Sequence, residues 1–278
     1  MSRKPSQTAP VPDKALIASS FAASLSTYEK HAGVQLALAQ KLLEMVCEYT
    51  DDVSWGRVLE VGCGTGWLAE RLVASRMPEH LYLNDIASEL CTYAVQRLHA
   101  APCLVESLAG DIETLELPEK LQLVLSSSTL QWIEDLPTLF EHVYQSLLPG
   151  GIMAFSIFAP GTMGEITALS GRGLHYFHRP QLSAMLKDFT ILAEETVRQR
   201  SYFPSLLALF RHIRNTGVGG LSRVHWTRAS LSRFEKQYRD QFGTAEGLPV
   251  TWRAHFFVVE KSKGYLDEKS ICCIGHRH

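Results

Sequence analysis

The chain has 278 residues, of which 46% are hydrophobic and 20% are charged, and its formal net charge is −2. This balance is typical of a globular protein that buries a full core without disulfide bonds. No stretch approaches the ~20 apolar residues of a membrane-spanning helix, and the first dozen residues lack the apolar core of a secretory signal. The six cysteines form no CxxC pair and the eleven histidines form no HExxH motif. We therefore expect a cytoplasmic protein with reduced thiols, no metal site and no contact with a membrane.

Apolar residues recur at helical spacing from Asp13, a candidate N-cap, to about Cys47, which predicts N-terminal helices over residues 13–50. Beyond them, short apolar runs alternate with helical patterns, and this alternation predicts a mostly parallel, doubly wound α/β sheet with helices on both faces. We expect strands at 57–61, 80–84, 103–106, 121–127, 151–158, 190–197 and 250–260, and helices at 66–75, 87–99, 136–148, 204–214 and 228–242.

The pattern predicts one domain over residues 13–261, with a ligand-binding core at 56–160 and a helical lid inserted at about 200–245. A turn at 147–151 should precede the fifth strand. Residues 1–12 are polar and rich in proline, and we expect them and residues 262–278 to be tails outside the fold.

Three alternating glycines follow an acidic residue where the first predicted strand meets a helix: Glu60, then Gly62, Gly64 and Gly66. A dinucleotide fingerprint counted from Gly62 needs a glycine at position 67, which is Trp67, and the Gly-Lys-Ser/Thr of a phosphate-binding loop is absent. The acid-x-GxGxG form is the one used for S-adenosylmethionine, which has no pyrophosphate to accommodate. The alternative is a plain turn between strand and helix, which does not require three such glycines.

Acidic residues also follow the next two predicted strands. Asp85 lies 21 residues beyond Gly64, where a carboxylate accepts hydrogen bonds from both hydroxyls of a ribose, although it could instead be only the N-cap of the following helix. Asp111 stands beside Ile112, a pair suited to the amino group and the ring face of an adenine. Because all three signals lie at carboxyl ends of strands, they predict one crevice in an open α/β sheet.

With these motifs the sequence resembles the class I S-adenosylmethionine-dependent methyltransferases. The resemblance extends to residues 126–132, after the fourth strand, and to the turn at 147–151. It implies a Rossmann-like methyltransferase sheet with S-adenosyl-L-methionine as the cofactor. The cofactor-binding residues that it implies are Glu60, Gly62, Cys63, Gly64, Gly66, Asp85, Ile86, Asp111, Ile112 and Ser127.

The flanks of this core are similar to one family, the malonyl-acyl-carrier protein O-methyltransferases of biotin synthesis. The residues that carry the similarity are Ser20-Phe21, Tyr28, His31-Ala32, Gln35, Leu130-Gln131-Trp132 and, in the lid, 211–217 and Leu221-Ser222-Arg223. The chain departs from the family at Ser127, where Asn is frequent, at Tyr176, where Arg is frequent, and at Arg214, where Lys is usual.

The family resemblance implies that Tyr28 closes over the cofactor and orients the reacting carboxylate, that Arg211 binds this carboxylate, and that Phe177 walls the pocket. Gln131, Trp132 and Arg214 are the other substrate-binding residues that it implies. Tyr28 and Phe177 could instead be packing aromatics. A carboxylate is already ionised at neutral pH, so we expect no obligatory general base.

The lid is strongly basic, with nine basic residues and one acid between Arg198 and Arg239, a charge of +8 in a chain of −2. An acidic carrier protein would be steered to such a face, although a solvated helix surface has similar charges. We expect a monomer that binds acyl carrier protein and no nucleic acid. The alternatives are a methyltransferase of a free carboxylic acid, an RNA or protein methyltransferase, and a non-enzymatic relative that binds the cofactor.

Overall fold

A computed structural model of the chain describes residues 13–50, 55–217 and 227–262. Seven strands form one sheet in the order β3-β2-β1-β4-β5-β7-β6. The first five in this order are parallel, and β7 and β6 are antiparallel to their neighbours. The strands are β1 (Arg57–Val61), β2 (His80–Asp85), β3 (Leu104–Ala109), β4 (Leu121–Ser127), β5 (Leu147–Phe158), β6 (Phe189–Phe203) and β7 (Leu248–Lys261).

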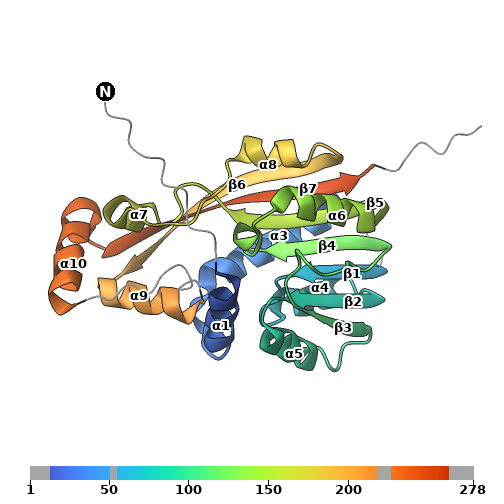
Figure 1. Ribbon diagram of the computed structural model, residues 1–278, viewed down its shortest axis with the longest axis horizontal. Helices are drawn as coiled ribbons and strands as arrows, with labels where there is room; N and C mark the ends of the chain where they lie inside the picture. Colours follow the sequence, from blue (N-terminus) through green and yellow to red (C-terminus); the bar gives the residue numbers. More distant parts are fainter. Residues whose placement is uncertain (1–12, 51–54, 218–226, 263–278) are drawn as a thin grey trace, which may run out of the picture.

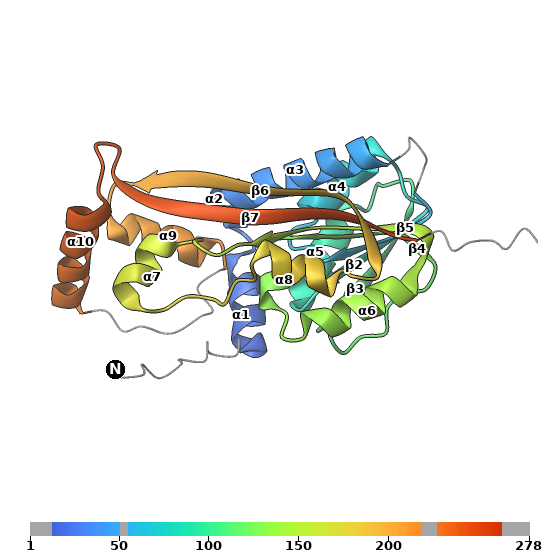
Figure 2. The same ribbon diagram turned by 90° about the horizontal axis from the view of Figure 1, so that it is seen from above.

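Helices cover both faces of this sheet, as Figures 1 and 2 show. One face packs against α3 (Gly33–Tyr49), α4 (Trp67–Ser75) and α5 (Ser88–Arg97), and the other against α6 (Leu136–Ser146) and α8 (Arg179–Met185). The remaining helices are α1 (Lys14–Ser24), α2 (Tyr28–His31), α7 (Gly164–Ser170), α9 (Leu206–Asn215), α10 (Arg228–Phe242) and the 3₁₀ turn η1 (Leu130–Trp132). The predicted α/β class with a mostly parallel Rossmann-like sheet is confirmed. No helix in the described ranges is long and apolar enough to cross a membrane.

Local sequence explains where several helices begin. The Asp13 side chain accepts a hydrogen bond from the backbone N–H of Leu16, so the predicted N-cap of the first helix is confirmed. Ser205 caps α9 in the same way, and Thr227 caps α10. Strands β1 and β4 are buried on both sides along most of their length, which is why they read as continuous apolar runs.

The structure differs from the expected elements in three places. The turn expected at 147–151 is part of β5, where Gly150 takes a positive φ and the register against β4 shifts between Leu121 and Leu123. Strand β6 runs six residues beyond the predicted 197, so the first residues of the predicted lid are strand. Helices α7 and α8 were not expected, since they are short and bury at most one side chain each. The predicted tails lie outside the described residues, except for residue 262.

Strands β6 and β7 continue as a two-stranded ribbon well past the end of β5, which pairs with β7 only as far as Phe158 and Ala254. Helices α7, α9 and α10 gather around the far part of this ribbon (Figures 1 and 2). Helices α9 and α10 therefore form the predicted late helical insertion, between β6 and β7. Helix α1 lies between these helices and the carboxyl ends of the parallel strands.

Candidate functional site

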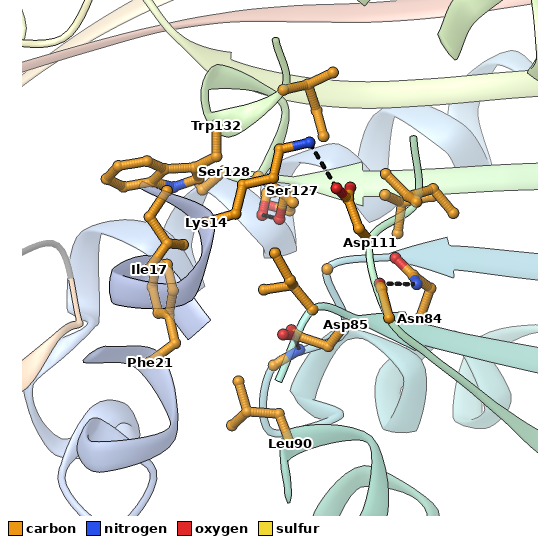
Figure 3. Close-up of a pocket in the computed structure, with 18 of the residues that line it drawn as sticks. Lys14, Ile17, Phe21, Asn84, Asp85, Leu90, Asp111, Ser127, Ser128 and Trp132 are labelled. Atoms are coloured by element: carbon orange, nitrogen blue, oxygen red, sulfur yellow. Dashed lines mark hydrogen bonds and ion pairs between the residues drawn. The ribbon is translucent and has the colours of Figure 1, made fainter. Parts of the chain in front are cut away.

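A cavity of about 830 Å³ opens at the carboxyl ends of β1, β2 and β4. Seven of the predicted cofactor-binding residues line it: Gly62, Gly64, Asp85, Ile86, Asp111, Ile112 and Ser127. Figure 3 shows Ile17, Phe21 and Trp132 on the opposite side of the cavity from Asp85 and Asp111. The predicted crevice therefore exists, and helix α1 supplies one of its walls.

The glycine loop needs glycine for two different reasons. Gly62 has φ +75°, and a Cβ there would lie 2.1 Å from the Thr129 Oγ1, so no side chain fits. Gly64 has φ +52°, but a Cβ there would meet no atom within 4 Å. Because Gly64 lines the cavity, its missing side chain leaves room for a ligand to lie against the backbone.

The Asp85 carboxylate is fixed by the backbone before any ligand arrives. It accepts hydrogen bonds from the N–H of Gly64 at 3.1 Å and of Ala87 at 3.0 Å. Burial nevertheless raises its pKa to about 6. Its ionised form therefore costs free energy in this cavity, and a ligand that brings positive charge or hydroxyl donors would recover that cost.

Three predicted cofactor contacts, Glu60, Cys63 and Gly66, do not line the cavity. Glu60 is buried behind the loop, where desolvation and the nearby Asp85 raise its pKa to about 8. A Cβ on Gly66 would lie 2.9 Å from the Cβ of Ala94, so this glycine permits close packing of the loop against α5. The structure thus places these three residues in the support of the loop, where their predicted contact with the cofactor stays a prediction.

Lys14, which the sequence motifs did not single out, reaches over the cavity from α1. Its Nζ lies 2.6 Å from the Asp111 Oδ2 and 2.5 Å from the Glu113 Oε2. Figure 3 shows the Lys14 side chain reaching Asp111, and both residues line the cavity. The ion pair links the N-terminal helix to the loop after β3. Because Lys14 and Asp111 are 97 residues apart in the sequence, no local motif predicts their contact.

Replacing Lys14 with methionine should weaken cofactor binding by about 2- to 5-fold, the scale of a partly exposed ion pair, and should do so by speeding dissociation. The physical reason is that α1 loses its tie to the loop that carries Asp111. Stopped-flow fluorescence would give the dissociation rate. Lys30→Met is the matched control, since Lys30 is exposed on α2 and lines neither cavity. Equal dissociation rates in both variants would contradict the assignment.

A second cavity, of about 370 Å³, adjoins the first. Four residues line both cavities: Phe21, Tyr28, Ser128 and Trp132. The second cavity continues from this shared wall to Gln35 of α3, Tyr176 of the loop before α8, and Trp252 of β7. A ligand in the first cavity and a ligand in the second would therefore meet beside Tyr28.

The structure brings some predicted substrate residues to this second cavity and leaves others outside. Tyr28, Gln131 and Trp132 line it. Phe177 does not line it and packs instead against the core cluster beneath α6 and α8, whereas its neighbour Tyr176 does line it. The roles predicted for these side chains stay predictions.

Arg211 and Arg214 are exposed on α9 and line neither cavity. Leu206 and Leu209 form the buried face of α9, whereas Leu207 is 55% exposed. Arg211 is four residues beyond Leu207 and so shares its exposed face. The guanidinium of Arg211 therefore does not reach the crevice in this arrangement.

Desolvation raises the pKa of the Tyr28 phenol above its usual range, and the nearby Asp85 adds to the effect. Desolvation also raises the pKa of the Tyr176 phenol. Both phenols are thus neutral hydrogen-bond donors at physiological pH. Among the described residues, no group of three or more His, Cys, Asp or Glu side chains is arranged to hold a metal ion.

Comparison with known proteins agrees with this geometry. The family described as "Methyltransferase domain" matches residues 59–155, which run from β1 through β5. The solved structure of the N-methyltransferase NodS from Bradyrhizobium japonicum, in complex with S-adenosyl-L-homocysteine, superposes with a TM-score of 0.51 at 14% identity. It covers 80% of this chain and 85% of that one, and at this identity it shows the fold alone. The fold and the glycine loop define the chain as an S-adenosylmethionine-dependent methyltransferase.

Two curated relatives show which family of methyltransferases the chain belongs to. The malonyl-acyl-carrier protein O-methyltransferase of Chlorobium luteolum is 34% identical over 253 residues, which cover 90% of this chain and 96% of the relative. The protein of the same name from Prosthecochloris aestuarii is 33% identical over 265 residues, covering 94% and 98%. The chain belongs to the family of malonyl-acyl-carrier protein O-methyltransferases.

Proposed function

We propose that the protein transfers the methyl group of S-adenosyl-L-methionine to the free carboxylate of a malonyl thioester carried by acyl carrier protein, in biotin synthesis. The observation that carries this proposal is the pair of adjoining cavities, which share Phe21, Tyr28, Ser128 and Trp132. One cavity has the acids and the glycine loop suited to the cofactor. The other adjoins it at Tyr28 and is lined by uncharged polar side chains that suit an acceptor. We also propose a cytoplasmic monomer.

The first cavity fits the cofactor by its own chemistry. The open space at Gly64 accommodates a ligand against the backbone, and Asp85 and Asp111 offer carboxylates to a ribose and to an adenine amino group. Ile86, Ile112 and Leu90 add apolar surface for the ring system. When bound, the cofactor supplies an electrophilic methyl group on a sulfonium.

The reaction needs positioning more than proton transfer. A bound cofactor would give its methyl group to an oxygen of the acceptor carboxylate and would leave as a neutral thioether, so the residues of this chain need not move a proton. The Tyr28 phenol stays protonated because burial raises its pKa, so it serves as a donor that orients the carboxylate and not as a base. Phe21 and Trp132, whose rings are 5.9 Å apart in an edge-to-face arrangement, exclude water beside it.

We assign the docking of the carrier protein to the exposed basic residues around α9 and α10. Eight of the nine predicted basic residues are described, and all eight are exposed: Arg198, Arg200, Arg211, Arg214, Arg228, Arg233, Lys236 and Arg239. Lys236 and Arg239 pair with Asp240 and Glu235 on their own helix. Arg211 and Arg214 form no ion pair with any described residue, which leaves their charge available to an acidic partner. The ninth residue, Arg223, lies outside the described residues.

If this face receives the carrier protein, kcat/KM for malonyl-carrier protein should fall steeply with added salt, and malonyl-coenzyme A should be affected less. The charge reversals Arg211→Glu and Arg214→Glu should each lower kcat/KM for the carrier-linked substrate by about 3- to 10-fold, through association. Lys187→Glu is the control, since Lys187 is exposed after α8, away from this face. Equal salt slopes for both substrates would favour an ordinary solvated surface.

The function is tested by incubating the protein with methyl-labelled cofactor and, separately, malonyl-carrier protein, malonyl-coenzyme A, free malonate and RNA. Base-labile label on malonyl-carrier protein is the expected result, because a methyl ester hydrolyses in base. Preferred labelling of free malonate would support a small-acid methyltransferase instead. Labelled RNA, or label on no acceptor, would overturn the proposal in favour of a nucleic-acid enzyme or a non-catalytic relative.

A further inference from the structure

The second cavity is uncharged. None of the described residues that line it is basic or acidic, although the first cavity has Lys14, Asp85, Asp111 and Glu113 in its wall. The polar side chains that line it are two amides, several hydroxyls and the indoles of Trp132 and Trp252. An anionic acceptor placed there would meet hydrogen-bond donors and no cationic side chain.

Several of these polar groups are buried without partners. Five of the ten buried side-chain polar atoms that lack a hydrogen bond within the described ranges belong to residues that line this cavity. They are the Gln35 Nε2 and Oε1, the Ser128 Oγ, the Gln131 Oε1 and the Trp252 Nε1. Gln35 is only 5% exposed and Trp252 only 2% exposed, so water does not readily satisfy them. Such groups are costly to bury unless a ligand completes their hydrogen bonds.

Backbone strain is concentrated at the same place. Among the described residues, three that are not glycine have a positive φ, and two of them, Ser128 at +57° and Met163 at +51°, line this cavity. Left-handed residues of this kind cost free energy and persist where the surrounding structure holds a site in shape. The strain and the unpartnered atoms are independent observations, and both indicate a site built for a ligand.

The chemistry of the reaction favours uncharged donors around the acceptor. Methyl transfer from a sulfonium to a carboxylate would yield a neutral ester and a neutral thioether, so both charges disappear as the reaction proceeds. A cationic side chain held against the carboxylate would stabilise the substrate more than the transition state and would slow the chemical step. Neutral donors orient the carboxylate, and their interaction energy with it falls less than that of a cation as the carboxylate loses its charge.

We propose that the Gln35 amide and the Trp252 indole N–H hold the malonyl group in the second cavity, and that the acceptor is thereby recognised by uncharged donors. This inference rests on the proposed function for the identity of the acceptor. Gln35 and Trp252 come from α3 and β7, and neither residue lines the first cavity.

The variants Gln35→Met and Trp252→Phe keep the apolar bulk and remove the polar atoms. Each should lower kcat/KM for the malonyl thioester by about 10- to 100-fold, the effect of losing a hydrogen bond to a charged group. Affinity for S-adenosylmethionine should not change. The melting temperature of Gln35→Met should hold or rise, because two unpaired buried atoms are removed.

Each variant has a matched control. Gln40→Met lies on the same helix, and the Gln40 amide donates to the Glu44 carboxylate outside both cavities. Trp55→Phe removes another buried indole N–H that lacks a partner in the described part of the chain, at a site that lines neither cavity. Both controls should retain wild-type kcat/KM.

Calorimetry supplies a readout independent of turnover. We expect malonyl-pantetheine to bind the wild-type protein more tightly when sinefungin, whose protonated amine replaces the sulfonium, fills the cofactor site than when S-adenosylhomocysteine does. The cofactor's positive charge would then be the counter-ion of the acceptor. Binding that is indifferent to this charge, or that is lost on Arg211→Ala with either cofactor analogue, would overturn recognition by uncharged donors.

The two proposals fail separately. If the wild-type protein methylates malonyl-carrier protein but both variants match their controls, the assignment of Gln35 and Trp252 is wrong and the proposed function stands. If the wild-type protein methylates no malonyl thioester, the proposed function is wrong. Malonyl-pantetheine binding that is weakened by Gln35→Met would still support the pocket in that case, and binding unaffected by it would reject the pocket as well.

Discussion

Gly62→Ala should abolish measurable cofactor binding and destabilise the fold by about 2–5 kcal/mol. This range combines the cost of a left-handed residue with a Cβ and that of forcing an atom into filled space. The new Cβ would lie 2.1 Å from the Oγ1 of Thr129 and 2.5 Å from its Cγ2. The loop must therefore move away from Thr129, which lines the same cavity. Thermal unfolding and calorimetry with the cofactor would measure both effects.

Gly64→Ala separates the cost of a side chain at a positive φ from the cost of a steric clash. This position also has a positive φ, but the added Cβ meets no atom within 4 Å. We expect a smaller loss of stability than for Gly62→Ala and still a clear loss of cofactor affinity, because the methyl group extends into the cavity. If both variants bind the cofactor like the wild type, the loop is not the cofactor cradle.

Asp85→Ala should weaken cofactor binding by about 1–3 kcal/mol, the scale of a hydrogen bond to a charged group. The free protein holds the pKa of Asp85 at about 6 because the carboxyl is buried. A pKa raised from its ordinary value means that ionised Asp85 opposes folding as the pH rises through about 6. A cationic ligand reverses that preference, so cofactor affinity should fall as the pH drops below about 6.

Calorimetry at several pH values checks this expectation. The wild-type protein should release a proton on binding near pH 6, seen as a dependence of the heat on the buffer's ionisation enthalpy, and Asp85→Ala should lose that component. Glu89→Ala is the control, since Glu89 is exposed in the first turn of the next helix, α5. An affinity for Asp85→Ala equal to that of Glu89→Ala would reject the ribose assignment.

The elements that could be predicted from sequence are those whose residues are buried along most of their length. Strand β4 was expected at 121–127 and has those bounds, because it is buried on both faces and reads as a continuous apolar run. The extension of β6 was not predictable, since its residues 198–200 are exposed and carry no alternating pattern. Helix α7 buries no side chain, so it leaves no apolar periodicity in the sequence.

The two cavities also differ in whether they could be predicted from sequence. The cofactor cavity could be predicted because its residues follow one another at the ends of successive strands, within one βαβ arrangement. The second cavity draws on α3, the loop after β4, the loop before α8 and β7, which are distant in sequence. No local spacing links Gln35 to Trp252. The lid helix was predictable, but which of its faces is buried was not, because this depends on packing that the sequence does not contain: Leu209 is buried and Arg211 is exposed.

The shared wall of the two cavities makes the N-terminal helices a point of thermodynamic linkage. Phe21 and Tyr28 contact both spaces, Lys14 ties α1 to the loop after β3, and the hydroxyl of Thr27 donates to the carbonyl of Asn215 at the end of α9. An occupant of either cavity therefore acts on the same short segment. By reciprocity, the factor by which the cofactor tightens acceptor binding equals the factor by which the acceptor tightens cofactor binding. The N-terminal segment thus couples binding in the first cavity to binding in the second.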